Sequence, residues 1–373
     1  MKRKFKLKIN GNSPRGIFLA FILANLKCDV YLNDCLKDSN LVKDYQIFLF
    51  SNYSRNLLSK FDIWDEIEDV SYGFNSLMFK DNFVSEQFLL RTENSSNKYL
   101  NTIGWIANYS DIKNILINKL INFDNVHIIS EKHLNDESFI FDYEFDFKNF
   151  DKMLNLFKLP LSIFKRIEEK VLIFNIYLRG HIDKRIYEIN TTEGLLILTP
   201  ISQNLYQVIW NNPSFKIKET SLSSKSFFID NLTTLLPSEL KIDQIIGDIN
   251  HLNVMDTFTT YLIRNKSLYF NENKFNSNTF FQFNFDTFLW KISQIYKVLE
   301  KDELRNTKIL YKVGFYYLLR KYIEIKINFS LFNSLFSLLK INNVFSLFLR
   351  KLLFNILKRI KFTKFFFMRN LNI

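Results

Sequence analysis

The residues with the clearest chemical potential lie near the start of the chain. Gly11, Ser13 and Gly16 follow the spacing G-x-G-x-x-G, with serine at the middle position. In a dinucleotide-binding turn the first glycine makes the tight turn, the middle one lets a pyrophosphate approach the backbone, and the last lets helix pack on strand. Asp34 follows 18 residues after Gly16, where a carboxylate accepts hydrogen bonds from ribose hydroxyls. The spacing favours a nucleotide site, with a structural turn of chance spacing as the alternative.

The elements that would position these residues are strand, turn, helix and strand. Phe5, Leu7 and Ile9 alternate with lysines, residues 17–26 are apolar enough for a buried helix, and residues 28–32 suit a second strand. This order opens a βαβ unit. A signal peptide also begins with basic and apolar residues, but here the glycine turn interrupts the run and no A-x-A cleavage site follows.

Composition and charge limit the class of protein. The chain has 373 residues, 47% of them hydrophobic, enough for two or three globular domains. It contains 41 Phe but only 8 Gly and 5 Pro, which we attribute to an AT-rich genome, so each remaining glycine carries more weight. The net charge is +12, yet residues 325–373 hold nine basic and no acidic residues, which leaves the rest at +3. A nearly neutral body with a basic tail argues against nucleic acid as the partner.

Metal and thiol chemistry find little support. Cys28 and Cys35 lack a C-x-x-C spacing and the four histidines form no ligand-spaced cluster, so we expect no metal, no disulfide scaffold and a reducing cytosol. Asp142, Glu144 and Asp146 alternate along one strand face, and we expect a solvated face rather than a metal site.

The remaining pattern predicts a mixed chain. Residues 44–67 suit one amphipathic helix, and residues 69–100 short strands and turns. Ser110 suits the cap of a helix over residues 112–121. Residues 160–255 alternate like an antiparallel sheet, and from residue 285 onward the pattern is helical.

Three segments carry further motifs in one consistent order. DYQIFLFSNYSRNLLSKFDIWDEI matches a stretch of the form D-x-R-x-x-A-L-S-x-x-S-x-x-L-L-x-x-L-G-L-W-D-x-I, with Gln46 at the arginine position. IGWIANYSDIKNIL keeps Gly104, and EGLLILTPISQNLYQVIW keeps Glu193 and Gly194. With these motifs the chain resembles the flavin-dependent aromatic hydroxylases, specifically the ubiquinone-biosynthesis monooxygenase branch.

The resemblance implies an α/β fold with a Rossmann-like FAD-binding domain, an inserted, mainly antiparallel β-sheet substrate domain and C-terminal helices. The implied boundaries are 1–68, 101–158 and 256–300 for the FAD-binding domain, 69–100 and 159–255 for the substrate domain, and 301–373 for basic amphipathic helices.

The resemblance also implies a reaction. FAD reduced by NAD(P)H would support hydroxylation of a prenylated phenol, an aromatic intermediate of ubiquinone biosynthesis. Because the cofactor carries that chemistry, no catalytic side chain is nominated. The implied cofactor-binding residues are Gly11, Ser13, Gly16, Asp34, Gln46, Glu272 and Asp286.

Two flavin motifs depart from the family. D-G-x-x-S-x-x-R falls on Asp146-Phe147, with other residues at the serine and arginine positions. In the ribityl motif Glu272 and Asp286 keep acidic or polar positions, while the glycines become Gln282, Asn284 and Phe288. Side chains would fill space where flavin meets bare backbone. Glu272 and Asp286 are therefore cofactor ligands or solvated carboxylates, and a non-catalytic descendant acting as a subunit of a membrane-associated assembly is the second hypothesis.

The basic tail suggests a membrane surface. Residues 331–339 and 344–349 are apolar, but Lys340 and two asparagines separate them, so neither run reaches the roughly 20 residues of a spanning helix. Basic amphipathic helices suit the headgroup layer of an anionic membrane. We expect a cytoplasmic protein on the inner-membrane surface, with other quinone-biosynthesis proteins as further partners. The alternative is that these helices cover the sheet and their lysines are solvated.

Overall fold

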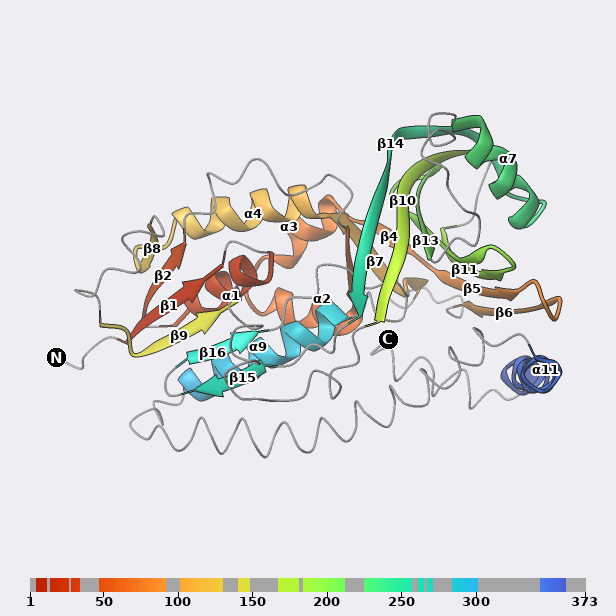
Figure 1. Cartoon of the computed structure of the whole chain (residues 1–373). Coiled ribbons are helices and arrows are strands. Elements are labelled where there is room, and N and C mark those ends of the chain that lie inside the picture. Colours follow the sequence, from red (N-terminus) through yellow and green to blue (C-terminus); the bar gives the residue numbers. More distant parts are fainter. Residues whose placement is uncertain are drawn as a thin grey trace.

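The computed structural model shows two large sheets with a small sheet between them (Figure 1). It describes residues 5–11, 14–26, 28–33, 47–91, 101–129, 140–147, 167–180, 184–211, 225–256, 261–264, 267–270, 284–300 and 343–359.

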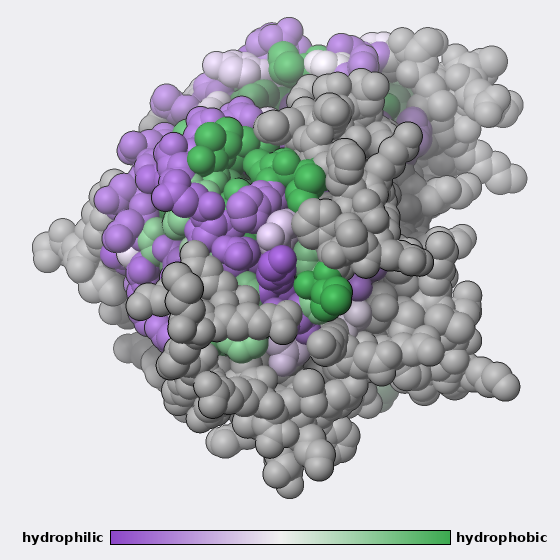
Figure 2. All heavy atoms as spheres, turned by 90° about the vertical axis from the view of Figure 1, so that its left-hand side faces the viewer, coloured by the Kyte–Doolittle hydropathy of each residue, from purple (hydrophilic) through white to green (hydrophobic). Residues whose placement is uncertain are grey.

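The first sheet is six-stranded and almost entirely parallel, in the order β15-β16-β9-β1-β2-β8. Only β15 pairs antiparallel, with β16. Seen from this end of the molecule, the described surface is mainly hydrophilic with smaller hydrophobic areas (Figure 2). The strands are β1 (Lys6–Asn10), β2 (Asp29–Asn33), β8 (Val126–Ile129), β9 (Tyr143–Asp146), β15 (Tyr261–Arg264) and β16 (Ser267–Phe270).

The second sheet is seven-stranded and mainly antiparallel, in the order β14-β10-β13-β12-β11-β5-β6. One parallel pair, β5 with β11, joins the early strands to the later ones. The strands are β5 (Ser76–Asp81), β6 (Glu86–Arg91), β10 (Ile167–Arg179), β11 (Arg185–Thr191), β12 (Gly194–Pro200), β13 (Leu205–Asn211) and β14 (Lys241–Asp256).

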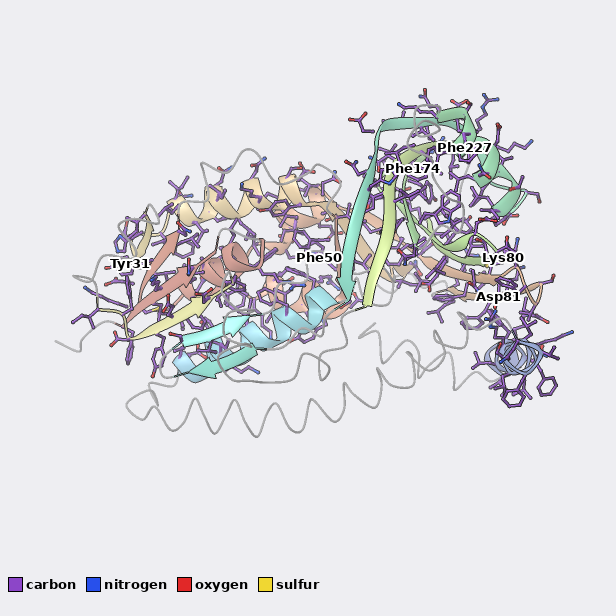
Figure 3. The ribbon with its side chains drawn as sticks, viewed as in Figure 1. Tyr31, Phe50, Lys80, Asp81, Phe174 and Phe227 are labelled. Atoms are coloured by element: carbon purple, nitrogen blue, oxygen red, sulfur yellow. The ribbon has the colours of Figure 1, made fainter. Side chains whose placement is uncertain are left out.

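A helix covers each face of the seven-stranded sheet. α7 (Lys225–Leu235) packs on the outer face, and Figure 3 labels Phe174 of the sheet and Phe227 of the helix. The ring of Phe174 lies 6.1 Å from that of Phe228, the next residue of α7. α11 (Val344–Arg359), seen end-on in Figure 1, packs against β6, and its Phe354 joins the apolar cluster of the inner face. A helix within residues 160–255 was missed by the sequence pattern, because α7 is short and weakly amphipathic.

The small sheet, in the order β3-β7-β4, corrects the prediction of one helix over residues 44–67. Its strands are β3 (Ile47–Ser51), β7 (Gly104–Asn108) and β4 (Tyr72–Phe74). The run Ile47–Ser51 is a strand because it pairs with β7. The helical part is split into α2 (Asn52–Ser59) and α3 (Trp64–Asp69), with a left-handed residue, Asp62, between them.

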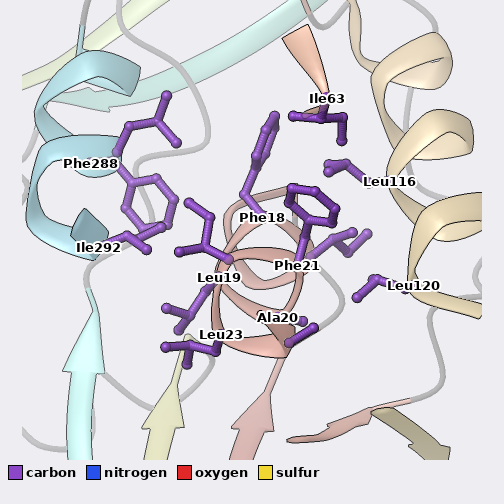
Figure 4. Packing of buried hydrophobic residues seen from close by; sticks show 14 of the residues in the cluster. Phe18, Leu19, Ala20, Phe21, Leu23, Ile63, Leu116, Leu120, Phe288 and Ile292 are labelled. Atoms are coloured by element: carbon purple, nitrogen blue, oxygen red, sulfur yellow. The ribbon is translucent and has the colours of Figure 1, made fainter. Parts of the chain in front are cut away.

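Helix α1 (Pro14–Ala24) is enclosed on all sides. Every residue from 17 to 24 is at most 3% exposed. The sheet covers one side, and α4 (Tyr109–Ile121) and α9 (Asn284–Glu300) cover two others (Figure 4). A helix that is apolar around its whole circumference is stable only when buried, so α1 forces these distant segments together.

The mixed α/β fold class predicted from the sequence is confirmed, and two local details are wrong. α4 is capped by the extended residue Asn108 rather than by Ser110, which lies inside the helix. Asp146, expected on a solvated face, is 3% exposed. β4 and β7 also pair across the predicted boundary at residue 100, and the domain boundaries stay predictions.

The glycines of the small sheet provide a test of its packing. A Cβ on Gly104 would lie 2.7 Å from the Phe50 carbonyl oxygen and 2.9 Å from Phe74 Cε1, whereas one on Gly73 would meet nothing nearer than 3.4 Å. We expect Gly104→Ala to lower the free energy of unfolding by about 1–3 kcal/mol. Gly73→Ala, in the neighbouring strand, is the control and should change it by less than half as much in denaturant titrations. Equal effects would contradict this packing.

Candidate functional site

The parallel sheet has a topological switch point between β1 and β9. From β1 the chain passes through α1 to β2 on one side, while β9 pairs with the other side of β1. In open α/β sheets, ligands bind beyond the carboxyl ends of the strands at such a point. The residues that follow β1 and β9 are therefore the first candidates for a binding site.

The turn after β1 depends on Gly11. Its φ of +144° lies in the region that side chains disfavour, and an added Cβ would lie 2.8 Å from Phe147 Cβ. The Phe147 amide donates to the Asn10 carbonyl oxygen (2.9 Å). The Asn10 carboxamide donates to Asp146 Oδ2 (3.0 Å), so the ends of β1 and β9 are tied together by side chain and backbone.

The amino end of α1 is electrostatically suited to an anion. α1 begins at Pro14, a residue favoured in a first helical turn because it needs no amide partner. No acidic residue lies in that turn, and Arg15 adds a positive charge to the helix dipole. Gly16 is buried, as a glycine at the helix–strand contact should be. This arrangement fits the phosphates of a dinucleotide.

Two phenylalanines pack beside this turn. Phe147 and Phe288 are both buried, and their rings lie 6.3 Å apart at 68°. The Arg15 guanidinium carbon lies 5.5 Å from the Phe288 ring centroid. Phe285, one turn earlier in α9, packs against both Phe288 (5.9 Å) and Phe18 (4.7 Å). The start of α9 is thus fixed against the α1 turn by aromatic contacts.

The structure reaches only part of the predicted cofactor site. Gly11 and Gly16 lie together at the β1–α1 turn, whereas Asp286 lies in the first turn of α9. The side chain of Asp286 falls outside the described residues. Four further predicted cofactor-binding residues also lie outside the described residues: Ser13, Asp34, Gln46 and Glu272. These assignments stay predictions.

Sequence reasoning missed Asn10 and Arg15. Asn10 could have been noticed as a polar residue at the end of a predicted strand. Its hydrogen-bond partner Asp146 lies 136 positions away, and a single sequence does not reveal that pairing. The carboxylates of β9 are also paired: Glu144 lies 3.1 Å from Lys8 Nζ, and Asp142 accepts from the Lys6 amide. The three carboxylates of this segment, Asp142, Glu144 and Asp146, therefore make contacts that hold β9 to β1.

Nucleophile and metal chemistry have no evident site in the described ranges. Cys28 is buried, and this desolvation, with the nearby Asp29 charge, raises its pKa to about 12. The thiol is therefore protonated at neutral pH and a poor nucleophile. Within the same ranges no three His, Cys, Asp or Glu residues gather to hold a metal ion.

The inner face of the seven-stranded sheet, which packs against the small sheet and α11, is mostly apolar. A polar row crosses it, because Asn175 pairs with Gln207 and Gln207 with Thr199. Thr199 is fully buried, and no described group bonds its hydroxyl. Such a group destabilises a fold by about 1–3 kcal/mol unless something compensates, which makes Thr199 a candidate functional residue.

Comparison with known proteins gives a clear result only for structure. No family model matches the sequence, and no curated protein matches it. p-Nitrophenol 4-monooxygenase PnpA from Pseudomonas putida is similar at a TM-score of 0.70 and 12% identity, over 100% of this chain and 99% of that one. PqsL from Pseudomonas aeruginosa, in complex with 2-aminobenzoylacetate, is similar at 0.63 and 12%, over 85% and 92%.

The chain has the fold of the FAD-dependent monooxygenases. A tryptophan halogenase from Shewanella frigidimarina is also similar, with a TM-score of 0.61 and 12% identity over 91% of this chain and 77% of that one. The fold is thus shared by enzymes with different reactions, and at this identity it establishes the architecture alone.

Two buried threonines of the seven-stranded sheet test whether the Thr199 hydroxyl lacks a hydrogen-bond partner. Thr199→Val removes a hydroxyl without a described partner, so we expect an unchanged or higher melting temperature. Thr191→Val is the control, because the Thr191 hydroxyl donates to the Gly194 carbonyl (2.6 Å) and accepts from the Glu193 amide (3.1 Å). That variant should lose about 1–3 kcal/mol. A Thr199→Val protein destabilised as much as Thr191→Val would show that its hydroxyl is bonded.

Proposed function

We propose that the protein is an FAD-dependent monooxygenase that hydroxylates an aromatic compound. The observation that carries the proposal is the Gly11 turn, which lies at the switch point of a parallel sheet in a fold shared over the whole chain with a monooxygenase. The names of two similar structures include p-nitrophenol and 2-aminobenzoylacetate, both small aromatic compounds, and this supports the substrate class.

The residues of the turn fit the ADP half of FAD. The amino end of α1 would receive the pyrophosphate, with Gly11 allowing close approach and Arg15 adding positive charge. Ser13 would donate to phosphate, and Asp34 would accept from the ribose, at the end of a strand whose last residue, Asn33, is buried. When bound, FAD reduced by NAD(P)H would supply the oxygen-transfer chemistry.

The finer substrate assignment rests on the family motifs. The resemblance to the ubiquinone-biosynthesis branch supports a prenylated phenol as substrate and NAD(P)H as reductant. A long prenyl chain keeps such a compound in the membrane, so peripheral association with a membrane surface belongs to the same proposal. Overall, one oxygen atom of O₂ would enter the ring and the other would leave as water, with the two electrons coming from NAD(P)H.

The first test is the absorption spectrum of the full chain purified in mild detergent. We expect flavin absorption, about one FAD per chain after release by heat, and NAD(P)H oxidation that a phenolic quinone precursor stimulates. The product should carry one additional oxygen atom. Gly11→Val is the control and should lose the flavin, because a side chain is disfavoured at a φ of +144° and its Cβ would lie 2.8 Å from Phe147 Cβ. A folded protein that takes up no added FAD would contradict the proposal.

A second candidate is favoured by the Phe147–Phe288 contact. Both residues stand at positions where the family motifs have glycine, and their buried rings lie against each other beside Gly11. Bulk at this point would reduce the space for flavin. The alternative is a non-catalytic descendant of the fold that serves as a subunit of a membrane-associated biosynthetic assembly.

Opening this contact distinguishes the two candidates. If the rings restrict the cofactor, Phe147→Gly/Phe288→Gly should bind FAD at least about tenfold more tightly than the unmodified chain in equilibrium dialysis. Phe174→Ala is the control, because it removes a buried ring that packs against Phe228 at the seven-stranded sheet, away from the Gly11 turn. Each core truncation should cost about 3–5 kcal/mol of stability, so folding is checked by circular dichroism. Unchanged FAD affinity would exclude the rings as the restriction.

A further inference from the structure

Helix α11 has two different faces. Ser346, Arg350 and Phe354, spaced four residues apart, are buried against the sheet. The opposite side carries five large apolar residues, four of them spaced four apart and the fifth, Phe345, beside the first, and they are 41–86% exposed. We call them the α11 stripe, made up of Val344, Phe345, Phe348, Leu352 and Ile356.

The buried face fixes α11 in one rotation. Arg350 Nη1 lies 3.2 Å from Asp81 Oδ2, with the two side chains 1% and 0% exposed. The Arg350 guanidinium also lies 5.6 Å from the Phe83 ring centroid. Figure 3 places Asp81 on the part of the sheet next to α11. Turning the stripe inward would break a buried ion pair, whose separation is strongly unfavourable.

Both ends of α11 are held as well. Asn343 Oδ1 accepts from the Ser346 amide (2.7 Å), which caps the first turn. Near the other end, Lys358 Nζ lies 2.5 Å from Glu86 Oε2 on β6. The stripe is thus a rigid, outward-facing surface rather than a frayed end. Monomeric soluble proteins rarely keep such a contiguous apolar surface unless something binds it.

The sequence charge of the segment that contains the stripe indicates what covers it, although Arg350 and Lys358 are themselves paired with Asp81 and Glu86. Lys351 is exposed on the same helix, and residues 325–373 hold nine basic and no acidic residues, while the rest of the chain is at +3. An apolar stripe in a basic segment matches the headgroup region of an anionic bilayer. Two copies of the chain packed through the stripe would bring their basic segments together, which disfavours a dimer.

The length of α11 decides between crossing and lying on a membrane. Its 16 residues span roughly 24 Å, less than the roughly 30 Å hydrocarbon core. Among the described residues, no helix is long and apolar enough to cross a bilayer. Because the stripe extends from Val344 to Ile356, over most of the helix, the axis of α11 would lie parallel to the membrane plane when the stripe is inserted.

We propose that the α11 stripe is the surface by which this protein docks on an anionic lipid bilayer. The stripe enters the headgroup layer while the Arg350–Asp81 pair holds the helix on the seven-stranded sheet. The mainly hydrophilic end seen in Figure 2 belongs to the other sheet. The inference gives the proposed membrane-surface enzyme its contact surface, but it does not depend on flavin.

Vesicle sedimentation of the full chain tests the docking surface. The probes are vesicles of phosphatidylcholine alone and with phosphatidylglycerol added. We expect binding to the anionic vesicles and at least about tenfold weaker binding by Phe345→Ser/Phe348→Ser/Leu352→Ser. The matched control is Val70→Ser/Ile121→Ser/Ile140→Ser, three residues exposed elsewhere, which should bind like the unmodified chain. Both variants should keep their melting temperature, because the changed side chains are exposed.

Charge reversal and oligomeric state complete the test. Lys351→Glu should weaken anionic binding severalfold, while Lys60→Glu, an exposed lysine at the end of α2, should not. Unweakened binding by the stripe variant would overturn the proposal. So would a lipid-free dimer that the stripe variant dissociates, because the occupant would then be a second copy. FAD content, measured in the same samples, separates failure of docking from failure of the proposed enzyme activity.

Discussion

The complete burial of α1 is the constraint on which the nucleotide-binding half depends. Its apolar circumference leaves no face for water, so the sheet, α4 and α9 must all close around it. These segments are far apart in the sequence, and the helix determines where they meet. One result is that Phe288, near the start of α9, reaches the Gly11 turn. The same packing that stabilises the domain therefore sets how much room remains beside a bound nucleotide.

The hydrophobic pattern of the sequence predicts those elements whose form depends on neighbouring residues in the chain. The alternation of Leu7 and Ile9, the glycines of the turn and the apolar run after them predicted β1 and α1 from the sequence. The same pattern gives the wrong element where strand pairing determines the structure. Ile47–Ser51 has the apolar residues of a helix, but it is a strand because β7 supplies its backbone hydrogen-bond partners. Ser110 is a residue type that often caps helices, but α4 begins at Tyr109, so the extended N-cap position is Asn108.

The candidate site likewise contains residues that the sequence predicts and contacts that it does not. Gly11 was predictable because glycine is needed there on conformational grounds alone, as its positive φ shows. The Asn10–Asp146 bond and the Phe147–Phe288 contact join residues more than 130 positions apart, and no periodicity encodes such a pairing. Asp146 was placed on a solvated face because alternation shows which side a residue faces, not what lies opposite it.

The Arg350–Asp81 pair has a consequence for biosynthesis. Ribosomes release the chain from its amino end, so Asp81 is made 269 residues before its cation emerges. Until then this carboxylate cannot be enclosed without a large desolvation penalty, and the edge of the seven-stranded sheet stays hydrated. Final consolidation of that sheet therefore waits for near-complete synthesis. A chain arrested before residue 350 would leave the inner face beside Asp81 exposed to water, and chaperones and proteases recognise such incompletely packed surfaces.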